Sequence, residues 1–364
     1  MVEWKTIGEV CYISDYVSNG SFASLRENVH YMNEPDYAVL VRFADFSSGF
    51  DKSKFVYIDE HAYNFLSKSS LEGGEIIMSN VGSCGLFFRC PKLDIKMSLA
   101  PNSILIKSDY IDYLFHWFSS ERGQEEIKKI TSKSAMPKFN KTEFKKIIIP
   151  IPSLEEQTRI VGILDTFTAS IENLKEQIAQ RRKQYEYYRD ELISFLFAKS
   201  PIVTMKDVAI IKNGKDYKHL SEGEVPVYGT GGIMTYVDSS FSDKPTVLLP
   251  RKGSVENIYY VNEPFWTVDT IYWTEIDTNK IEPKYLYYSL LKYNLKDFAY
   301  GGARPSLSQP ILYRLEIPLP SLSEQSRIVF ILDTFEASIQ NLEAQLSQRE
   351  KQYEYYRNKL LTFE

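Results

Sequence analysis

One segment of this 364-residue chain occurs twice, and the repeat constrains the fold more than any other feature of the sequence. Residues 149–195 return as 317–363 at a constant offset of 168, with about two-thirds of the positions identical. Repetition on this scale indicates that a structural unit was duplicated. The chain is also long enough for two domains or more.

Each copy has the apolar spacing of a long helix. Within 160–195 and 328–363, alternating steps of four and three residues land on apolar or aromatic side chains, broken only by Arg181 and Arg349. A seam with this period over about five heptads is typical of a coiled coil. The arginines either mark the register of a buried seam or turn out of it towards water. Each copy is expected to form a helix of roughly 40 residues, about 60 Å long.

The helix starts and the chain connection predict how the helices pair. Ser153 with Glu156, and Ser321 with Glu324, follow a proline and predict capping boxes. Two long helices with matching seams most economically pair with each other, although packing against another protein stays open. Antiparallel pairing is favoured, because a parallel second helix would force its domain to reach back along the whole first helix.

The predicted fold class is therefore α+β. Two mixed, strand-rich globular domains are separated by two long helices, which form an antiparallel coiled coil with a pseudo-twofold relation from the internal duplication. The expected boundaries are 1–152 for the first globular domain, 153–199 for the first helix, 200–320 for the second globular domain and 321–364 for the second helix.

The globular domains belong to the same duplication. The opening of the first, Ile7–Val10, lies over Met205–Val208 at an offset of 198. Because the helices repeat at 168, the first domain must be longer by 30 residues. Short β-branched and aromatic runs in the first domain predict strands, and one helical spacing predicts a helix. The strands are expected at Tyr37–Phe46, Glu75–Met78, Leu86–Arg89 and Ser103–Ile106, and the helix at Tyr110–Glu121.

Composition excludes several classes of protein. The content of 43% hydrophobic and 25% charged residues is that of a soluble globular protein, and no apolar run approaches a membrane span. The N-terminus has no signal-peptide core. Cys11, Cys84 and Cys90 are odd in number and lack metal spacing, which favours the reducing cytoplasm.

The sequence offers no convincing catalytic centre. Its four histidines are scattered without ligand spacing, so no metal site is expected, and it has no P-loop and no Gly-x-Gly-x-x-Gly. Residues 262–265 (Asn-Glu-Pro-Phe) are similar to the Asn-Pro-Pro-Phe box of amino-methyltransferases, but glutamate replaces the first proline. We therefore expect no enzyme activity and no cofactor.

Candidate ligand-contacting residues come from loops and from one basic segment. In the second domain, residues 228–232, 251–254 and 301–306 set glycine beside hydroxyl, aromatic or arginine groups, which suits contact with phosphates or base edges. In the first domain, residues 122–146 carry eight basic side chains against three acids, although the whole chain has a net charge of −5. Plain turns and a solvated lysine-rich face remain the alternative interpretations.

The duplicated arrangement resembles the specificity subunit of type I restriction-modification systems over the full length of the chain. The motif Ile-Pro-x-Pro-Ser-Leu begins at 149 and at 317, and in that family this segment opens each conserved helix. The loops 228–232 and 251–253 and the stretch 266–270 are also similar. The first domain matches more weakly.

The resemblance implies a function. Each globular domain would be a target recognition domain that reads one half of a split DNA sequence, and the helices would set the spacer. It also implies assembly with two modification (methyltransferase) subunits and with ATP-driven restriction subunits, while this subunit itself catalyses nothing. The alternatives are a coiled-coil scaffold whose domains bind proteins, and an enzyme with an unrecognised site.

Specific residues are predicted for these contacts. We expect DNA contacts from Asn80, Ser83, Lys133 and Lys138 in the first domain, and from Tyr228, Thr230, Gly231, Arg251, Lys252, Ser254, Arg304 and Ser306 in the second. Partner subunits are expected at the helix starts, through Glu156, Gln157, Arg159, Glu324, Gln325 and Arg327.

Overall fold

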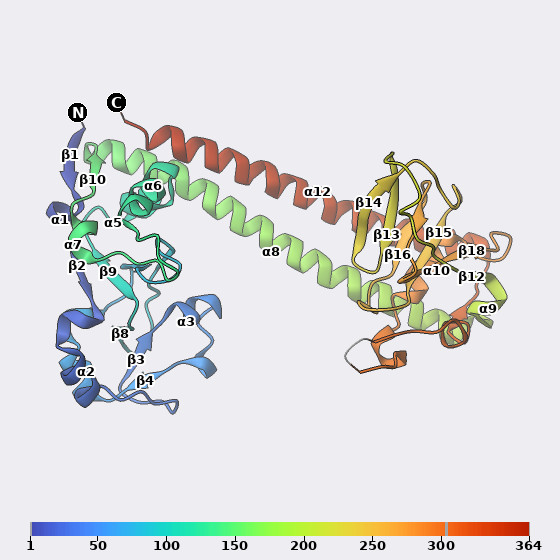
Figure 1. Cartoon of the computed structure of the whole chain (residues 1–364), viewed down its shortest axis with the longest axis horizontal. Helices are drawn as coiled ribbons and strands as arrows, with labels where there is room; N and C mark the ends of the chain where they lie inside the picture. The colour runs from blue at the N-terminus through green and yellow to red at the C-terminus, as the bar shows by residue number, and fades with distance from the viewer. Residues whose placement is uncertain (1, 303–304, 364) are drawn as a thin grey trace. The chain divides into compact units, whose positions relative to one another are not determined.

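The structure is a computed structural model that describes residues 2–302 and 305–363 (Figure 1). Internal contacts divide the chain into two compact units: unit 1 comprises Met1–Asn173 and Leu346–Glu364, and unit 2 comprises Leu174–Gln345. Each unit therefore combines one globular part with the adjacent portions of both long helices. The boundaries expected from the sequence instead listed each helix as a segment separate from the globular parts. No helix in the described part of the chain is both long and apolar enough to cross a bilayer.

Unit 1 contains two four-stranded sheets and one strand pair. The sheet orders are β2-β9-β6-β7 and β4-β3-β8-β5, and β1 pairs with β10. Its elements are β1 Glu3–Thr6, α1 Ile7–Val10, β2 Tyr12–Asp15, η1 Tyr16–Asn19, α2 Phe22–Asn28, β3 Ala38–Val41, α3 Phe43–Ser47, η2 Lys52–Lys54, β4 Tyr57–Ile58, α4 Glu60–Phe65, η3 Ser67–Ser69, β5 Ser70–Leu71, β6 Ile76–Ser79, β7 Phe87–Arg89, β8 Lys96–Leu99, β9 Ser103–Lys107, α5 Ile111–Ser119, α6 Glu121–Ile130, α7 Lys141–Lys145, β10 Ile148–Ile151 and the start of α8 Leu154–Lys199.

Unit 2 contains one four-stranded sheet, one three-stranded sheet and one strand pair. The orders are β12-β18-β15-β16 and β14-β13-β17, and β11 pairs with β19. Its elements are β11 Ile202–Thr204, α9 Met205–Val208, β12 Ala209–Asn213, β13 Val225–Gly229, β14 Gly232–Val237, β15 Thr246–Pro250, β16 Tyr259–Val261, β17 Trp266–Thr267, β18 Ile271–Ile276, α10 Pro283–Leu290, η4 Leu295–Phe298, α11 Gln309–Leu312, β19 Glu316–Pro318 and the start of α12 Leu322–Leu360.

The four-stranded sheets β2-β9-β6-β7 and β12-β18-β15-β16 share one topology, because corresponding strands pair in the same order and all pairs are antiparallel. Side chains alternate between their faces as strand geometry requires. In β6, Ile76 and Met78 pack towards α5 and the helix pair, whereas Ile77 packs against the other sheet of unit 1. The predicted duplication therefore extends through the globular parts.

The domain openings also fold alike. The Thr6 backbone N–H donates to Glu9 Oε2 at 2.6 Å, and the Thr204 N–H donates to Asp207 Oδ2 at 2.7 Å. The short helices α1 and α9 thus begin with the same capping arrangement. The extra length of the first domain lies mostly between β2 and β6, where most of the second sheet of unit 1 forms.

The prediction of a strand at Tyr37–Phe46 is wrong over the second half of this segment. Strand β3 ends at Val41, and α3 begins at Phe43. Asp45 causes the change, because its buried carboxylate accepts from the Arg42 backbone N–H at 2.8 Å and from the Arg42 guanidinium. Side-chain capping of this kind stops a strand that hydrophobic patterning alone would continue.

The long helices begin where predicted, but only half of each capping box forms. The Glu156 N–H donates to Ser153 Oγ at 3.4 Å, as the Glu324 N–H does to Ser321 Oγ. The Glu156 carboxylate pairs instead with Arg159 one turn further along, and Glu324 pairs with Arg327. Ion pairs along the helix therefore replace the side-chain contact back to the cap.

Within each unit the two helices run antiparallel. In unit 1, the ring of Phe167 stacks on that of Tyr356 with centroids 5.5 Å apart, near the start of α8 and the end of α12. In unit 2, Tyr188 stacks on Phe335 at 5.5 Å, near the end of α8 and the start of α12. In the same unit, Arg182 on α8 donates to Glu343 on α12. Because the partner number on α12 falls from 343 to 335 as the residue number on α8 rises from 182 to 188, the antiparallel prediction is confirmed.

The seam is less buried than a regular coiled coil would be. Arg349 lies 5.6 Å from the centre of the Phe167 ring, and Arg181 lies 5.9 Å from the Phe335 ring, so both arginines pack on an aromatic face of the opposite helix. Phe195 is 61% exposed and Tyr188 is 48% exposed, which the seam did not predict. Two helices cover only one side of such rings.

A buried histidine joins the globular part of unit 1 to both helices. His116 Nε2 lies 2.8 Å from Asp165 Oδ1, and its Nδ1 lies 3.4 Å from the Tyr353 hydroxyl. This geometry fits the neutral ring, donating to the carboxylate and accepting from the hydroxyl. Tyr288 occupies the equivalent place in unit 2 and donates to Asp333 Oδ1 at 2.6 Å. Desolvation lowers the pKa of His116 despite the nearby carboxylate.

We predict that His116 makes stability depend on pH. Because the folded state disfavours the imidazolium, the unfolded state takes up the proton first as pH falls below about 6.5. The free energy of unfolding should therefore fall more between pH 7 and 5.5 in the wild type than in His116→Tyr, which copies unit 2, or in His116→Gln. Urea denaturation of each protein at both pH values measures this. An equal decrease in all three would contradict the assignment.

Candidate nucleic-acid interface

The four predicted DNA-contacting residues of unit 1 lie on two loops that pair with each other. We call residues 80–85 and 132–139 the unit 1 loop pair. The Gly82 N–H donates to Pro137 O at 2.8 Å, the Phe139 N–H donates to Asn80 O at 3.1 Å, and Val81 and Lys138 form an isolated antiparallel bridge. The structure thus brings together residues more than 50 positions apart in the sequence.

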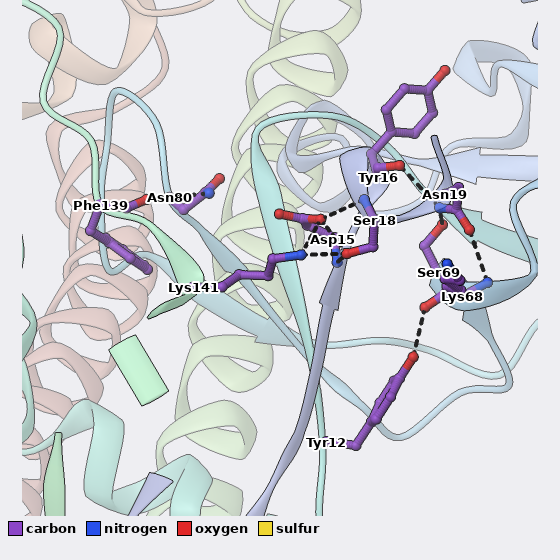
Figure 2. A network of polar contacts seen from close by, with 10 residues as sticks. All are labelled: Tyr12, Asp15, Tyr16, Ser18, Asn19, Lys68, Ser69, Asn80, Phe139 and Lys141. Carbon is purple, nitrogen blue, oxygen red and sulfur yellow. Dashed lines mark hydrogen bonds and ion pairs between the residues drawn. The ribbon is translucent and has the colours of Figure 1, made fainter. Parts of the chain in front are cut away.

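A polar network braces the far end of this loop pair (Figure 2). Lys141, the first residue of α7, donates to Asp15 Oδ1 at 2.7 Å and also contacts the Ser18 hydroxyl. Asp15 ends strand β2 and is buried, so the pair ties the loop to the sheet. Lys141 belongs to the basic segment of the sequence, and its charge is balanced by that of Asp15.

The other lysines of the basic segment fall into two groups. Lys129 pairs with Glu126 and Lys146 with Glu143, whereas Lys128, Lys133, Lys138 and Lys145 are exposed and have no ion pair among the described residues. Unpaired exposed lysines on a loop are suited to bind phosphate oxygens, since no local carboxylate competes for them. Lys133 and Lys138 are the two of these four that lie on the loop 132–139.

Asn80 is half-buried. Its amide oxygen is buried, and its Nδ2 lies 3.5 Å from Phe139 O (Figure 2). Its contact with DNA stays a prediction. Ser83, by contrast, is exposed. It lines an open cavity of about 610 Å³ together with Asn102, Leu40 and Phe43, which gives room for a ligand beside the loop pair.

The predicted loops of unit 2 also meet. We call residues 251–256 and 300–307 the unit 2 loop pair; Arg304 lies outside the described residues, as does residue 303. The Gly253 N–H donates to Pro305 O at 3.1 Å, and Lys252 and Ser306 form an antiparallel bridge. Thr230 comes close as well, because its carbonyl accepts from Asn257 Nδ2 at 2.7 Å and from the Tyr259 hydroxyl at 3.1 Å.

Tyr228, which the sequence predicts as a DNA contact, is buried. It is 9% exposed and packs with Leu248 and Phe265 in the core behind the loops. The same desolvation raises the pKa of its hydroxyl. The β-branched and aromatic run that ends in this tyrosine forms strand β13, so its ring serves packing. Gly231, three residues on, is exposed with open space around it.

Two basic side chains of the unit 2 loop pair, those of Arg251 and Lys252, contact neighbouring residues. Arg251 Nη1 donates to Asp269 O at 3.1 Å, and its guanidinium lies 5.7 Å from the centre of the Tyr272 ring. Lys252 Nζ lies 3.5 Å from Asp269 Oδ2. Ser254 is exposed and Ser306 is half-buried. Arg251 is therefore oriented in advance, and a guanidinium so fixed loses little freedom on binding a base edge.

The predicted partner-binding residues at the helix starts separate into two kinds. Gln157 and Gln325 are buried, and each donates from Nε2 to the carbonyl of the proline before its helix, at 2.8 and 3.0 Å. They hold the chain turn together, and their contact with partner subunits stays a prediction. The ion pairs Glu156–Arg159 and Glu324–Arg327 remain on the surface.

The sequence analysis did not identify the residues whose carbonyl groups bind the start of each loop. The Asn80 N–H donates to Asn102 O, and the Arg251 N–H donates to Thr270 O. Asn102 and Thr270 are 168 positions apart, so extending the helix offset into the domains would have paired them. Asn102 has φ of 68°, a left-handed conformation that asparagine tolerates better than most residues. Asn257 carries no comparable signal in the sequence.

Comparisons with known proteins address the whole chain. The family model described as the type I restriction modification DNA specificity domain matches twice, over residues 1–181 and 199–350. A type I restriction enzyme specificity subunit of Haemophilus influenzae is 31% identical over 259 residues, which are 62% of this chain and 66% of that protein. The EcoR124I/EcoR124II specificity subunit of Escherichia coli is 31% identical over 60% of this chain and 63% of its own length.

The chain thus spans somewhat less than two-thirds of these two relatives. A type I specificity subunit of Mycoplasma pneumoniae is 29% identical over 66% of this chain and 95% of its own length. A crystal structure of the type I restriction-modification S subunit from M. genitalium has the same fold, with a TM-score of 0.62 and 19% identity over 100% of this chain and 97% of that one. The two family matches cover most of the chain, and it therefore belongs to the family of type I restriction-modification specificity subunits.

Proposed function

We propose that this chain selects the DNA sequence for a type I restriction-modification enzyme, with each unit reading one half of a bipartite target. The observation that carries the proposal is the presence in both units of a loop pair built on the same kind of four-stranded sheet. These loops expose hydroxyl and cationic side chains, the groups that bind base edges and phosphates. Two such surfaces in one chain suit a target in two halves.

Antiparallel helices suit the proposed target. Duplex DNA has an approximate dyad, and proteins that read both halves of a site from one side commonly do so about one helical turn apart, near 34 Å. We infer that α8 and α12 set the length of the unread spacer. The subunit itself catalyses nothing on this proposal, works in the cytoplasm where the DNA is, and needs no cofactor or metal.

Methyltransferase subunits are the proposed partners along the helices. Large side chains remain exposed near the end of each helix: Tyr187, Tyr188 and Phe195 on α8, and Tyr355 and Tyr356 on α12. Exposed aromatic groups in such numbers commonly mark protein interfaces. Their duplication fits two modification subunits, one at each equivalent surface, and ATP-dependent restriction subunits would join the complete enzyme.

The net charge of −5 fits this assembly, because cations from the partners would have to support DNA binding. An electrophoretic mobility shift of the chain with its methyltransferase subunits tests the proposal. The complex should bind duplex DNA with salt-dependent affinity, and a size-matched polyanion should not compete for the specific site. Failure to bind duplex DNA under these conditions would favour the protein-binding scaffold.

We predict that Lys133→Gln and Lys138→Gln weaken binding alike on target and non-target duplexes. Each exposed lysine contributes a phosphate contact, so each substitution should reduce the slope of log K against log salt by about 1. Lys146→Gln is the matched control, since Lys146 is paired with Glu143 at 2.8 Å. Titrations at several salt concentrations measure the slope; an unchanged slope in both loop variants would remove these lysines from the interface.

We predict that inserting one heptad into α8 and one into α12 lengthens the spacer and leaves both half-sites unchanged. Seven residues add about 10 Å to a helix, close to the length of three base pairs. Insertion at corresponding positions between the stacked rings keeps the apolar period. Sequencing of the DNA methylated by the modification complex gives the spacer, and an unchanged spacer would show that the helices do not set it.

A further inference from the structure

The loop pairs of the two units share one backbone arrangement, although their side chains differ. The Asn80 N–H donates to Asn102 O at 3.2 Å, and the Arg251 N–H donates to Thr270 O at 2.9 Å. The return contacts also correspond, since the Phe139 N–H donates to Asn80 O at 3.1 Å. In unit 2, the Leu307 N–H donates to Arg251 O at 2.9 Å.

A third hydrogen bond is also present in both units. The contact from Gly82 N–H to Pro137 O is matched by that from Gly253 N–H to Pro305 O, and both glycines are left-handed, with φ of 78° and 88°. A residue with a side chain would be strained at either glycine.

The contact that closes the longer loop is matched as well. The Ser132 N–H donates to Lys138 O at 2.9 Å, and the Tyr300 N–H donates to Ser306 O at 3.0 Å.

Equivalent positions follow directly from these contacts. Position 83 corresponds to 254, and residues 132, 137 and 138 correspond to 300, 305 and 306. Ser83 and Ser254 are both serine and both exposed, directly after the left-handed glycine. The backbone arrangement is thus constant, and the side chains that it presents are the variable part.

In unit 1 the longer loop carries a large exposed apolar side chain at Met136, which is 66% exposed. The Ser134 hydroxyl donates to the Met136 carbonyl at 2.7 Å, and the Ser132 hydroxyl accepts from the Lys138 N–H at 3.0 Å. The loop is therefore held by its own hydrogen bonds, while the methionine side chain stays in solvent. A large exposed apolar group on an ordered loop is suited to contact a base edge, such as a thymine methyl group.

We propose that base selection in each half-site is made by the side chains at the exposed positions of this shared loop pair: 83 and 134–136 in unit 1, and the equivalent position 254 with the described residues of 301–306 in unit 2. The inference rests on the proposed function and assigns its specificity to a few interchangeable positions. The rest of each loop supplies a backbone that need not change when the target changes.

The test selects bound duplexes from a randomised library with the assembled modification complex, using wild type, Ser83→Arg, Met136→Arg and Ser254→Arg. The first two should alter the preferred bases in one half-site only, towards guanine, and the third should alter only the other half-site, each by about tenfold or more in preference. Phe22→Arg is the matched control, because Phe22 is 83% exposed on α2 outside the loop pair. It should leave both half-sites unchanged.

The outcomes separate the two proposals. If the wild-type complex selects no bipartite sequence, the proposed function fails. If it does, and the loop variants select the wild-type sequence in both halves, base selection lies elsewhere and this inference is overturned. Should an arginine variant bind no duplex, Ser83→Ala and Ser254→Ala decide instead, since they preserve the loop and should relax selection in one half-site each.

Discussion

Antiparallel packing of the two long helices determines how the rest of the chain is used. Because the end of α12 packs beside the start of α8 in unit 1, and the reverse holds in unit 2, each unit is built from both copies of the repeat. The stacked rings and the arginines that pack on them recur in both units. The strong similarity of the helices follows, since each copy must both begin one unit and complete the other.

The requirement that the two copies stay alike is weaker for the globular parts than for the helices. Their sheets keep the same strand order, and the loops above them keep four hydrogen bonds and a left-handed glycine. Outside these contacts the units differ, for example where unit 1 inserts further strands and helices between β2 and β6. A constant backbone with variable exposed side chains allows the target to change while the fold stays stable, because surface substitutions away from such contacts cost little free energy.

The sequence predicted the helices, their direction and the duplicated layout, because period and offset are properties of a whole segment. It also located the loops, since glycine and exposed hydroxyl groups cluster there. What a single side chain decides could not be predicted. Asp45 ends a strand, Tyr228 and Gln325 are buried, and the Asn80 amide contacts the backbone, and none of these contacts follows from residue type or spacing alone. The exposed side of the helix pair was not predicted, because the apolar period of a helix does not show how many other helices pack against it.

We have proposed that one chain with two equivalent surfaces specifies a DNA target in two halves. Sequencing of methylated bases in the genome of a host with and without this gene tests this proposal most directly. One motif that depends on the gene is expected, with two specified half-sites separated by a spacer of fixed length and arbitrary sequence. A continuous motif, or a methylation pattern that does not change when the gene is removed, would contradict it.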